Sequence, residues 1–244
     1  MLGMILWRDI EPGKGRKAVI LREMSILQMR VLCAEVLRTP RTPEALLRRR
    51  TAAAGKLLHR RGITRVILPQ VFPLRQQLPL WGLEAVSTVP LRQALAADWV
   101  RLLLAQRGLS AASARVAVCA DRLTGEAVRT VTELALRHRY VLLDAGYGGE
   151  ELARRLRREY GVSLLVNRPA EEVGTAEMRV LFSPRGDCRG GGILRLYEET
   201  APLPRLSLPP ALEERLPAGA DRGQLLAALR EAGVIRTGQI TVEG

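Results

Sequence analysis

The sequence predicts an α/β protein built on a parallel sheet. Three times between Arg115 and Ser183, an apolar, β-rich segment runs through a loop of small or charged residues into an expected helix or turn. The clearest case is Tyr140–Glu150, where an apolar strand leads into glycines at the start of an Arg- and Glu-rich helix. Strands that alternate with helices of about 10–15 residues indicate βαβ units. We therefore expect a Rossmann-like parallel sheet with flanking helices.

The beginning of the chain predicts a β-hairpin. Two apolar, β-prone runs, Leu2–Trp7 and Lys17–Arg22, flank a stretch from Glu11 to Arg16 that contains Pro-Gly and Lys-Gly. These dipeptides form turns, so the two runs are expected to pair across them. The next apolar segment, residues 25–37, fits a strand and a helix equally well.

A basic helix is predicted next. Thr42 as N-cap and Pro43 at the first helical position start it, and Gly62 ends it after Arg61. Placed at 100° per residue, its apolar residues form one arc: Leu46, Leu47, Ala53, Ala54, Leu57 and Leu58. Arg50 falls inside this arc, where its stem covers apolar surface or its guanidinium meets an anion in a cleft.

Two further elements precede the central region. Residues 64–68 predict a short strand closed by Pro69. Thr88 and Pro90 then open a helix that runs to Arg107. Apolar side chains cover much of its circumference, which is typical of a helix buried between layers.

The central region predicts four strands, at residues 116–119, 140–143, 162–166 and 178–182. Thr124 is the expected N-cap of the first helix between them. The second helix is expected over Gly149–Tyr160, with Gly161 as its terminator. Together these elements form the predicted parallel sheet.

The C-terminal part is expected to add an antiparallel strand over Ile193–Tyr197, a Pro-rich strap and a small helix. Residues 201–217 hold five of the 14 prolines, and Asp221 and Gly233 bound the last helix. We therefore expect a basic N-terminal α/β region over residues 1–110, a Rossmann-like core over 111–200 and a strap with a C-terminal helix over 201–244. All three are also compatible with one compact domain.

Positive charge is concentrated near the N-terminus. The chain has 35 Arg, three Lys and a net charge of +13. Residues 1–80 carry 16 basic and 5 acidic side chains, whereas residues 81–244 carry 22 and 20. Such a field attracts nucleic acid, anionic lipid or an acidic partner protein, although a solvated Arg-rich helix face accounts for the same charges.

Cysteine usage indicates a reducing compartment. Cys33 and Cys119 lie in apolar runs and are expected as buried thiols, and the third cysteine, Cys188, lies in a glycine-rich loop. With no apolar run near the roughly 18–20 residues of a membrane span, and no signal peptide, we expect a cytoplasmic protein without a membrane span.

A candidate binding edge follows from the predicted topology. In an open parallel sheet, ligands bind beyond the carboxyl ends of the strands. The loops expected there carry charged and hydroxyl side chains able to hold a phosphate-bearing or polar ligand: Asp121, Arg122, Thr124, Asp144, Asn167, Arg168, Arg185 and Asp187. Ion pairing among these same side chains is the competing interpretation.

Glycines at one of these loops sharpen the interpretation. Gly146-Tyr-Gly148-Gly149 resembles the G-x-G-G variant in the NADP-binding domain of shikimate dehydrogenases. The likeness extends to Asn167-Arg168-Pro169, where that family carries Asn-Arg-Thr. It implies that Gly146, Gly148 and Gly149 hold the pyrophosphate of NADP and that Arg168 meets the adenosine 2′-phosphate.

The resemblance covers about 30 residues, and the chain departs from the family within them. Glu150 and Glu151 lie in the first helical turn, where their carboxylates would repel a phosphate bound at the helix N-terminus. Asp144 replaces a small residue, and the family's catalytic Lys–Asp pair has no counterpart, because Lys56 is the last lysine.

Three functional hypotheses follow. The favoured one is a degenerate Rossmann-like scaffold that acts without catalysis through protein contacts. The alternative is a protein that binds NADP or another nucleotide, with or without oxidoreductase activity. The third is a nucleic-acid binder that uses the basic helix through Arg48, Arg49, Lys56 and Arg60.

Overall fold

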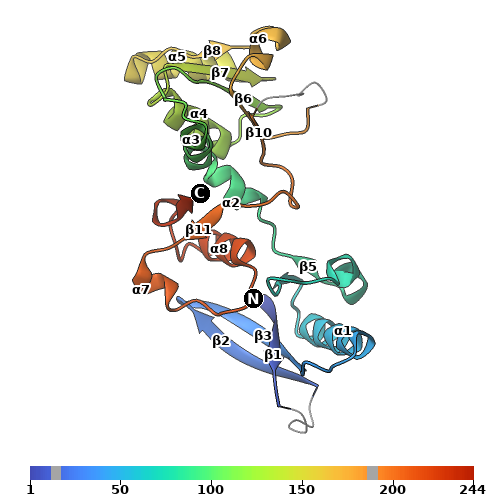
Figure 1. The fold of residues 1–244 in the computed structure, drawn as a ribbon. Helices are drawn as coiled ribbons and strands as arrows, with labels where there is room; N and C mark the ends of the chain where they lie inside the picture. Colours follow the sequence, from blue (N-terminus) through green and yellow to red (C-terminus); the bar gives the residue numbers. More distant parts are fainter. Residues whose placement is uncertain (12–17, 186–191) are drawn as a thin grey trace. The chain divides into compact units, whose positions relative to one another are not determined.

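The computed structural model describes residues 1–11, 18–185 and 192–244. The chain forms two compact units (Figure 1). Unit 1 comprises residues 1–88 and 208–240, and unit 2 comprises residues 89–207 and 241–244. These bounds differ from the predicted ones near residues 110 and 200. The reason is that the helices after residue 88 pack on the parallel sheet, while the last helix returns to the N-terminal sheet.

Unit 1 is built on a five-stranded sheet in the order β2-β3-β1-β4-β5. Its strands are β1 (Leu2–Asp9), β2 (Val19–Ile26), β3 (Met29–Arg38), β4 (Arg65–Ile67) and β5 (Glu84–Ala85). β3, β1, β4 and β5 run parallel, and β2 joins the edge antiparallel to β3. The basic N-terminal region is therefore itself an α/β structure, with a mostly parallel sheet of its own.

The predicted hairpin between the first two apolar runs is wrong. β1 pairs with β3 in parallel, from Leu2 opposite Val31, and β2 makes its hairpin with β3 instead. The burial pattern explains the order. β1 and β3 contain continuous buried runs, at residues 3–6 and 31–37, which suit strands in the middle of a sheet. In β2 only Ile26 is buried, which suits an edge strand. The predicted turn at residues 12–16 lies outside the described residues.

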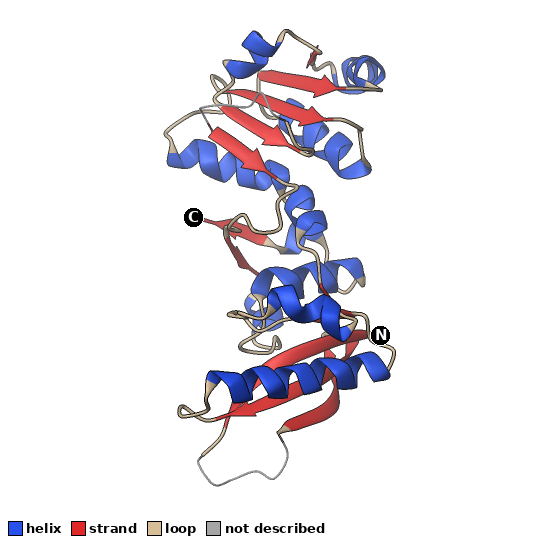
Figure 2. Cartoon of the chain, turned by 90° about the vertical axis from the view of Figure 1, so that its right-hand side faces the viewer, coloured by secondary structure: helices blue, strands red, loops and turns tan. Residues whose placement is uncertain are grey.

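One face of this sheet is covered by α1 (Glu44–Arg60), the long helix that lies across it in Figure 2. Ala54 and Leu58 of the predicted arc are buried as expected, but Ala53 is exposed. Thr42 does not cap the helix, because its hydroxyl accepts a hydrogen bond from the Thr39 N–H (2.7 Å) and closes the preceding turn. The indole of Trp81, from the 3-10 helix η1 (Arg75–Trp81), completes the core.

The C-terminal segment of unit 1 contains α7 (Pro210–Glu213), α8 (Arg222–Glu231) and the 3-10 turn η2 (Thr237–Gln239). Asp221 caps α8 as predicted, accepting a hydrogen bond from the Gln224 N–H at 2.8 Å. The buried Gln224 side chain accepts from the Leu68 N–H, just after β4, at 2.9 Å. Arg65 of β4 and Glu231 of α8 form a bidentate ion pair. These contacts hold α8 on the sheet of unit 1, and the boundary between the two units falls within the Pro-rich segment 201–217.

The buried thiol of Cys33 gives unit 1 a pH dependence. Burial first, and then the nearby Glu35 carboxylate, raises the pKa of Cys33 from 9.0 to about 11. Between these values the folded state keeps a proton that the unfolded state releases. The free energy of unfolding should therefore fall as pH rises from 9.0 to about 11, by roughly 2–3 kcal/mol. Urea unfolding across this range measures it, and Cys33→Ala should remove this part of the slope. An unchanged slope in Cys33→Ala would contradict the prediction.

Unit 2 contains the predicted Rossmann-like sheet. All five strands run parallel, in the order β10-β9-β6-β7-β8, and the longer arrows of this sheet point the same way in Figure 2. The strands are β6 (Arg115–Ala120), β7 (Tyr140–Ala145), β8 (Leu165–Val166), β9 (Met178–Leu181) and β10 (Gly192–Arg195). The predicted α/β class and parallel sheet are confirmed.

Helices cover both faces of this sheet. The helices are α2 (Val89–Ala94), α3 (Ala96–Gln106), α4 (Gly125–Ala135), α5 (Gly149–Tyr160) and α6 (Ala170–Gly174). Residues of α3, α4 and α5 pack on Val116 and Val118 of β6, whereas Val173 of α6 packs on Ala117 and Cys119 from the other face. A small antiparallel pair, β11 (Arg205–Ser207) and β12 (Thr241–Glu243), completes the unit.

Three details differ from the predictions. The helix expected from Thr88 to Arg107 is broken at Leu95 into α2 and α3. β8 keeps only the last two residues of its predicted range. β10 is parallel to β9, with Gly192 opposite Met178, and not antiparallel as expected. Within the described ranges, no helix combines the length and apolar character needed to cross a membrane.

Candidate functional site

The strand order of unit 2 locates a candidate binding edge. The chain adds β7 and β8 on one side of β6, and then crosses to place β9 and β10 on the other side. The loops that leave β6 and β9 therefore diverge, and in open α/β sheets the crevice at such a reversal receives ligands. Residues 121–124 and 183–185 occupy these two loops.

Charged side chains from three strands meet at this edge. The Arg185 guanidinium lies 3.2 Å from a carboxylate oxygen of Asp144, and its Nε lies 3.9 Å from Asp121. The Asp121 N–H donates to the hydroxyl oxygen of Ser183 at 3.1 Å, which ties the two diverging loops together. Asp121 is exposed, whereas Asp144 and Arg185 are about a quarter exposed. The ion pairing weighed from the sequence is therefore present at the very residues expected to bind a ligand.

Gly146 packs directly against this cluster. A Cβ at that position would stand 2.9 Å from the carbonyl oxygen of Asp121, closer than a side chain tolerates. Glycine is therefore needed so that the loop after β7 can approach the loop after β6. In the structure this approach brings the two loops into contact with each other.

The other two glycines shape the start of α5. Gly148 is its N-cap, with φ of +79° in the left-handed region that favours glycine. A Cβ on Gly149 would stand 2.8 Å from Val166, so this residue lets the helix pack closely on β8. Glu150 and Glu151 follow in the first turn, as the sequence predicted.

Asn167 and Arg168 make local contacts at the outer edge of the sheet. Asn167 has φ of +47°, and its side-chain oxygen accepts a hydrogen bond from the Ala145 N–H at 3.0 Å. Arg168 is half exposed and pairs with Glu172 one turn further on, at 2.8 Å. Both follow β8, the outermost strand on this side, and so stand two strands away from β6.

The loop after β6 is the first loop of the βαβ series, and it has no glycine fingerprint. Thr124 caps α4, accepting from the Ala127 N–H at 3.2 Å as predicted, and Arg122 is exposed. The glycines stand instead in the second loop, after β7. Asp144 thus takes the place at the end of the second strand, roughly 20 residues after the first loop, where dinucleotide-binding units carry the acidic residue that contacts ribose.

The two histidines lie away from this edge. His138 is buried behind the C-terminal end of α4, where loss of hydration lowers its pKa and the carbonyl of Ala111 offsets the effect in part. His59 is exposed on α1 of unit 1. Over the described ranges, no three His, Cys, Asp or Glu side chains gather to hold a metal ion. Cys188 and Asp187 lie outside the described residues.

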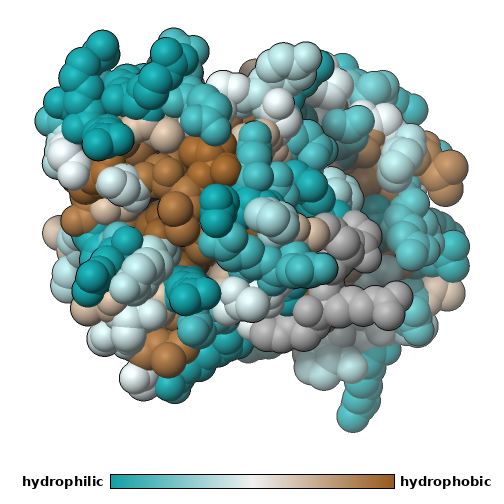
Figure 3. Space-filling view, turned by 90° about the horizontal axis from the view of Figure 1, so that it is seen from above, coloured by the Kyte–Doolittle hydropathy of each residue, from teal (hydrophilic) through white to brown (hydrophobic). Residues whose placement is uncertain are grey.

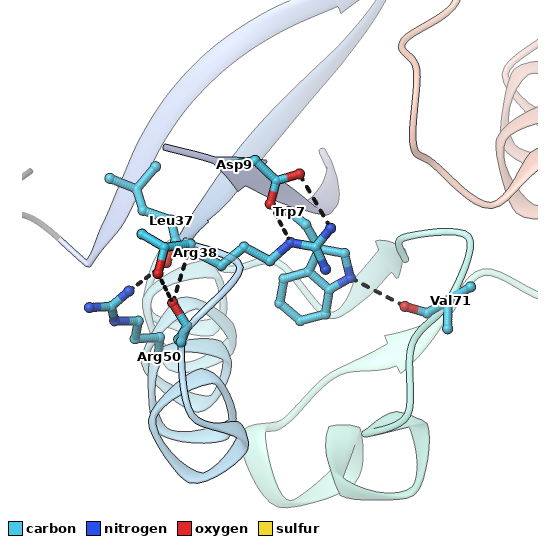
Figure 4. Close-up of polar contacts among 8 residues, drawn as sticks. Trp7, Asp9, Leu37, Arg38, Arg50 and Val71 are labelled. Atoms are coloured by element: carbon cyan, nitrogen blue, oxygen red, sulfur yellow. Dashed lines mark hydrogen bonds and ion pairs between the residues drawn. The ribbon is translucent and has the colours of Figure 1, made fainter. Parts of the chain in front are cut away.

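The basic residues of α1 are exposed. Arg49, Lys56 and Arg60 fall within about 40° of one another around the helix, while Arg48 hydrogen bonds to Gln77 at 3.2 Å. Arg50 reaches none of them. Its guanidinium donates to the Leu37 carbonyl at 2.6 Å and so ties α1 to the end of β3 (Figure 4).

The carboxyl end of the unit 1 sheet carries an aromatic group that the sequence did not single out. Trp7 stacks on Phe72 with ring centres 5.8 Å apart, and its Nε1 donates to the Val71 carbonyl at 3.2 Å. Arg38 lies over the Trp7 ring and pairs with Asp9 at 2.8 Å, as Figure 4 shows. The aromatic residues come from β1 and from the loop after β4, which are distant in sequence.

A groove in unit 2 was also missed. It has a volume of about 530 Å³ and lies beside α5, where Arg154, Arg155 and Arg158 line it together with Leu123 of the first loop. The spacing of these arginines along α5 was the one sequence signal that could have indicated the groove. The Leu123 contact depends on the tertiary structure and has no sequence signature.

Comparisons with known proteins yield weak structural likenesses and no family. No protein-family model and no curated protein matches the chain. Among solved structures, L-tryptophan dehydrogenase from Nostoc punctiforme matches at 15% identity and a TM-score of 0.28, over 62% of this chain and 44% of that one. A D-isomer specific 2-hydroxyacid dehydrogenase from Lactobacillus delbrueckii ssp. bulgaricus, in its NAD-complexed form, matches at 10% identity and 0.26, over 62% and 56%.

A third match is the hetero-hexameric glutamate dehydrogenase from Thermus thermophilus, at 15% identity and a TM-score of 0.26, over 74% of this chain and 53% of that one. The chain thus spans about half the length of each of these proteins. The three are dehydrogenases, but likenesses this weak carry no argument about activity. A particular likeness to shikimate dehydrogenases is not among them. The fold assignment therefore rests on the strand order of the chain itself.

Proposed function

We propose that unit 2 binds a nucleotide at the carboxyl edge of its parallel sheet. One observation carries the proposal: the strand order reverses at β6, and Asp121, Asp144 and Arg185 converge at that reversal. In this proposal Asp144 accepts hydrogen bonds from ribose hydroxyls, and Arg185 turns from the carboxylates to a phosphate. The proposal is limited to binding, because neither histidine of the chain stands at the edge.

The glycine loop offers a second placement of the same ligand. Following the sequence resemblance, Gly146, Gly148 and Gly149 would approach the pyrophosphate of NADP, and Arg168 would leave Glu172 for the 2′-phosphate. The two placements depend on different residues. Asp144 matters only in the first, and Arg168 only in the second.

A thermal-shift screen with NADP, NAD, ATP and 2′,5′-ADP tests the proposal. At a ligand concentration about 100-fold above Kd, a binder should raise Tm by roughly 5 °C or more. Asp144→Asn should remove the shift if the ribose lies at the β6 edge. Arg168→Ala should remove it, for NADP and 2′,5′-ADP only, if the glycine loop holds the ligand.

Arg139→Ala serves as the matched control, because Arg139 contacts the Tyr140 ring at the opposite end of β7. It should leave every shift unchanged. If none of the four ligands raises Tm, the nucleotide proposal fails in both placements.

The second candidate function, a scaffold that acts through protein contacts, is favoured by exposed apolar residues around α5. Tyr147 is 86% exposed, Tyr160 is 53% exposed and Leu165 of the edge strand β8 is 40% exposed. Figure 3 shows a face on which hydrophilic side chains border hydrophobic surface. An exposed strand edge beside apolar side chains is a site at which another chain can add. Failure of the nucleotide screen, with binding of a partner lost in Leu165→Lys, would favour this function.

A further inference from the structure

We propose that the groove beside α5 is a separate site for a small organic phosphate, a phosphate ester with an apolar body. The groove has a volume of about 530 Å³, within the range of roughly 300–1,000 Å³ typical of small-molecule sites. The proposal goes beyond the nucleotide proposal, because Asp121, Asp144 and Arg185 do not line the groove. Gly148 of the glycine loop does line it, so the groove borders the second nucleotide placement.

The floor of the groove is apolar. Leu123 comes from the loop after β6, Val128 from α4 and Leu152 from α5. Leu152 is buried in the core, and Leu123 and Val128 are partly buried against it. These side chains are held by the packing of two helices on one sheet, so the floor is formed before any ligand arrives. It suits the apolar part of a ligand.

The rim of the groove is cationic. Arg154, Arg155 and Arg158 line it, against one carboxylate, Glu151. Across the described ranges, Arg154 and Arg155 form no ion pair, and Arg158 only reaches Glu159 at 3.8 Å. Three guanidinium groups that outnumber the acid at the mouth of a groove favour a doubly charged anion, and a guanidinium binds phosphate oxygens in a bidentate manner.

The two parts together select the ligand. A bare anion satisfies the rim but not the floor, and a neutral apolar compound satisfies the floor but not the rim. A long polyanion would need basic side chains that continue past the groove, whereas the next charged group on the helix is Glu159. A small phosphate ester meets both demands.

Phenyl phosphate is the probe, because it has no ribose and therefore does not report on Asp144. Isothermal titration with the full chain at low ionic strength should show binding of phenyl phosphate, with phenol and inorganic phosphate at least 10-fold weaker. Arg155→Ser should weaken phenyl phosphate roughly 10-fold, as expected for the loss of a charge-assisted hydrogen bond. Val128→Trp, which fills the groove, should abolish binding.

Arg157→Ser is the matched control, since Arg157 is exposed on the same helix and does not line the groove. It should change the affinity less than 2-fold, and circular dichroism should show each variant folded. An equal loss in Arg157→Ser and Arg155→Ser would overturn the proposal, because it would show non-specific attraction by the helix. So would equal affinity for inorganic phosphate, or no binding at all. Asp144→Asn and Arg168→Ala should both leave phenyl phosphate binding unaffected, which separates this site from both placements of the nucleotide.

Discussion

Replacing Trp81 with alanine should lower the free energy of unfolding of unit 1 by about 3–5 kcal/mol. The indole is 6% exposed and belongs to the core under α1. Its ring lies against the helix backbone at Gly55, where a Cβ would stand 2.8 Å from Trp81 Cε3. Truncation would remove that contact and leave a cavity between α1 and the sheet of unit 1. The other side chains of the core hold α1 in place, so the helix cannot move inward to fill it. Urea unfolding followed by circular dichroism at 222 nm measures the loss.

Leu80→Ala provides the control for this prediction. Leu80 precedes Trp81 in the same 3-10 helix but is 78% exposed, so its truncation should change stability by less than about 0.5 kcal/mol. If the two variants are equally stable, the indole does not contribute to the core as the structure indicates.

Removing both arginines that flank Glu35 should cost unit 1 about 3–5 kcal/mol. Glu35 lies on β3 with its side chain 4% exposed, and it pairs with Arg8 at 2.8 Å and with Arg22. Each arginine is about half exposed, so its charge is largely hydrated without the ion pair, whereas the charge of Glu35 is not, because its carboxylate is buried. Arg8→Leu with Arg22→Leu would therefore leave an uncompensated charge inside the sheet.

Two further variants distinguish this cause from simple loss of surface charge. Adding Glu35→Leu to the double variant should restore most of the stability, because the buried charge is then gone. Arg38→Leu should cost less than about 1 kcal/mol, since its partner Asp9 is 69% exposed. A double variant no less stable than Arg38→Leu, in the same urea titration, would refute the role of Glu35.

Elements marked by local chemistry were predicted well from the sequence. α5 runs from Gly149 to Tyr160 and ends at Gly161, as expected, because left-handed glycines bound it at both ends. Thr124 and Asp221 both cap the helices that they were predicted to cap. In each case, a side chain or a glycine within a few residues determines where the helix begins or ends.

The strand pairing in unit 1 was not predictable in this way. Ile26 and Met29 are joined by Leu27 and Gln28, both with positive φ, in a tight turn. Such turns ordinarily need Gly or Asn, so Leu-Gln carries no turn signal. The turn-forming Pro-Gly and Lys-Gly pairs at residues 12–15 instead predicted a hairpin between β1 and β2. Both β1 and β2 pair with β3, which lies between them and is buried on both faces.

The candidate site was predicted as a set of residues, but not as an arrangement. Asp121, Asp144 and Arg185 were expected at one edge and do meet there. The sequence shows that the glycine loop follows the second strand of the series, but where that strand lies relative to the reversal depends on strand order, which local sequence does not encode. The structure places it after β7, one strand away from the reversal at β6.

The sequence by itself determined the α/β class, the parallel sheet of unit 2 and the residues at its carboxyl edge. Periodic burial and helix caps are local properties, and a short window of residues expresses them. Only the tertiary structure decided which strands are neighbours, that residues 208–240 return to unit 1, and that Arg185 pairs with Asp144. These depend on contacts between residues distant in the chain, where the free energy gained by burying surface selects one pairing among several that the local sequence allows.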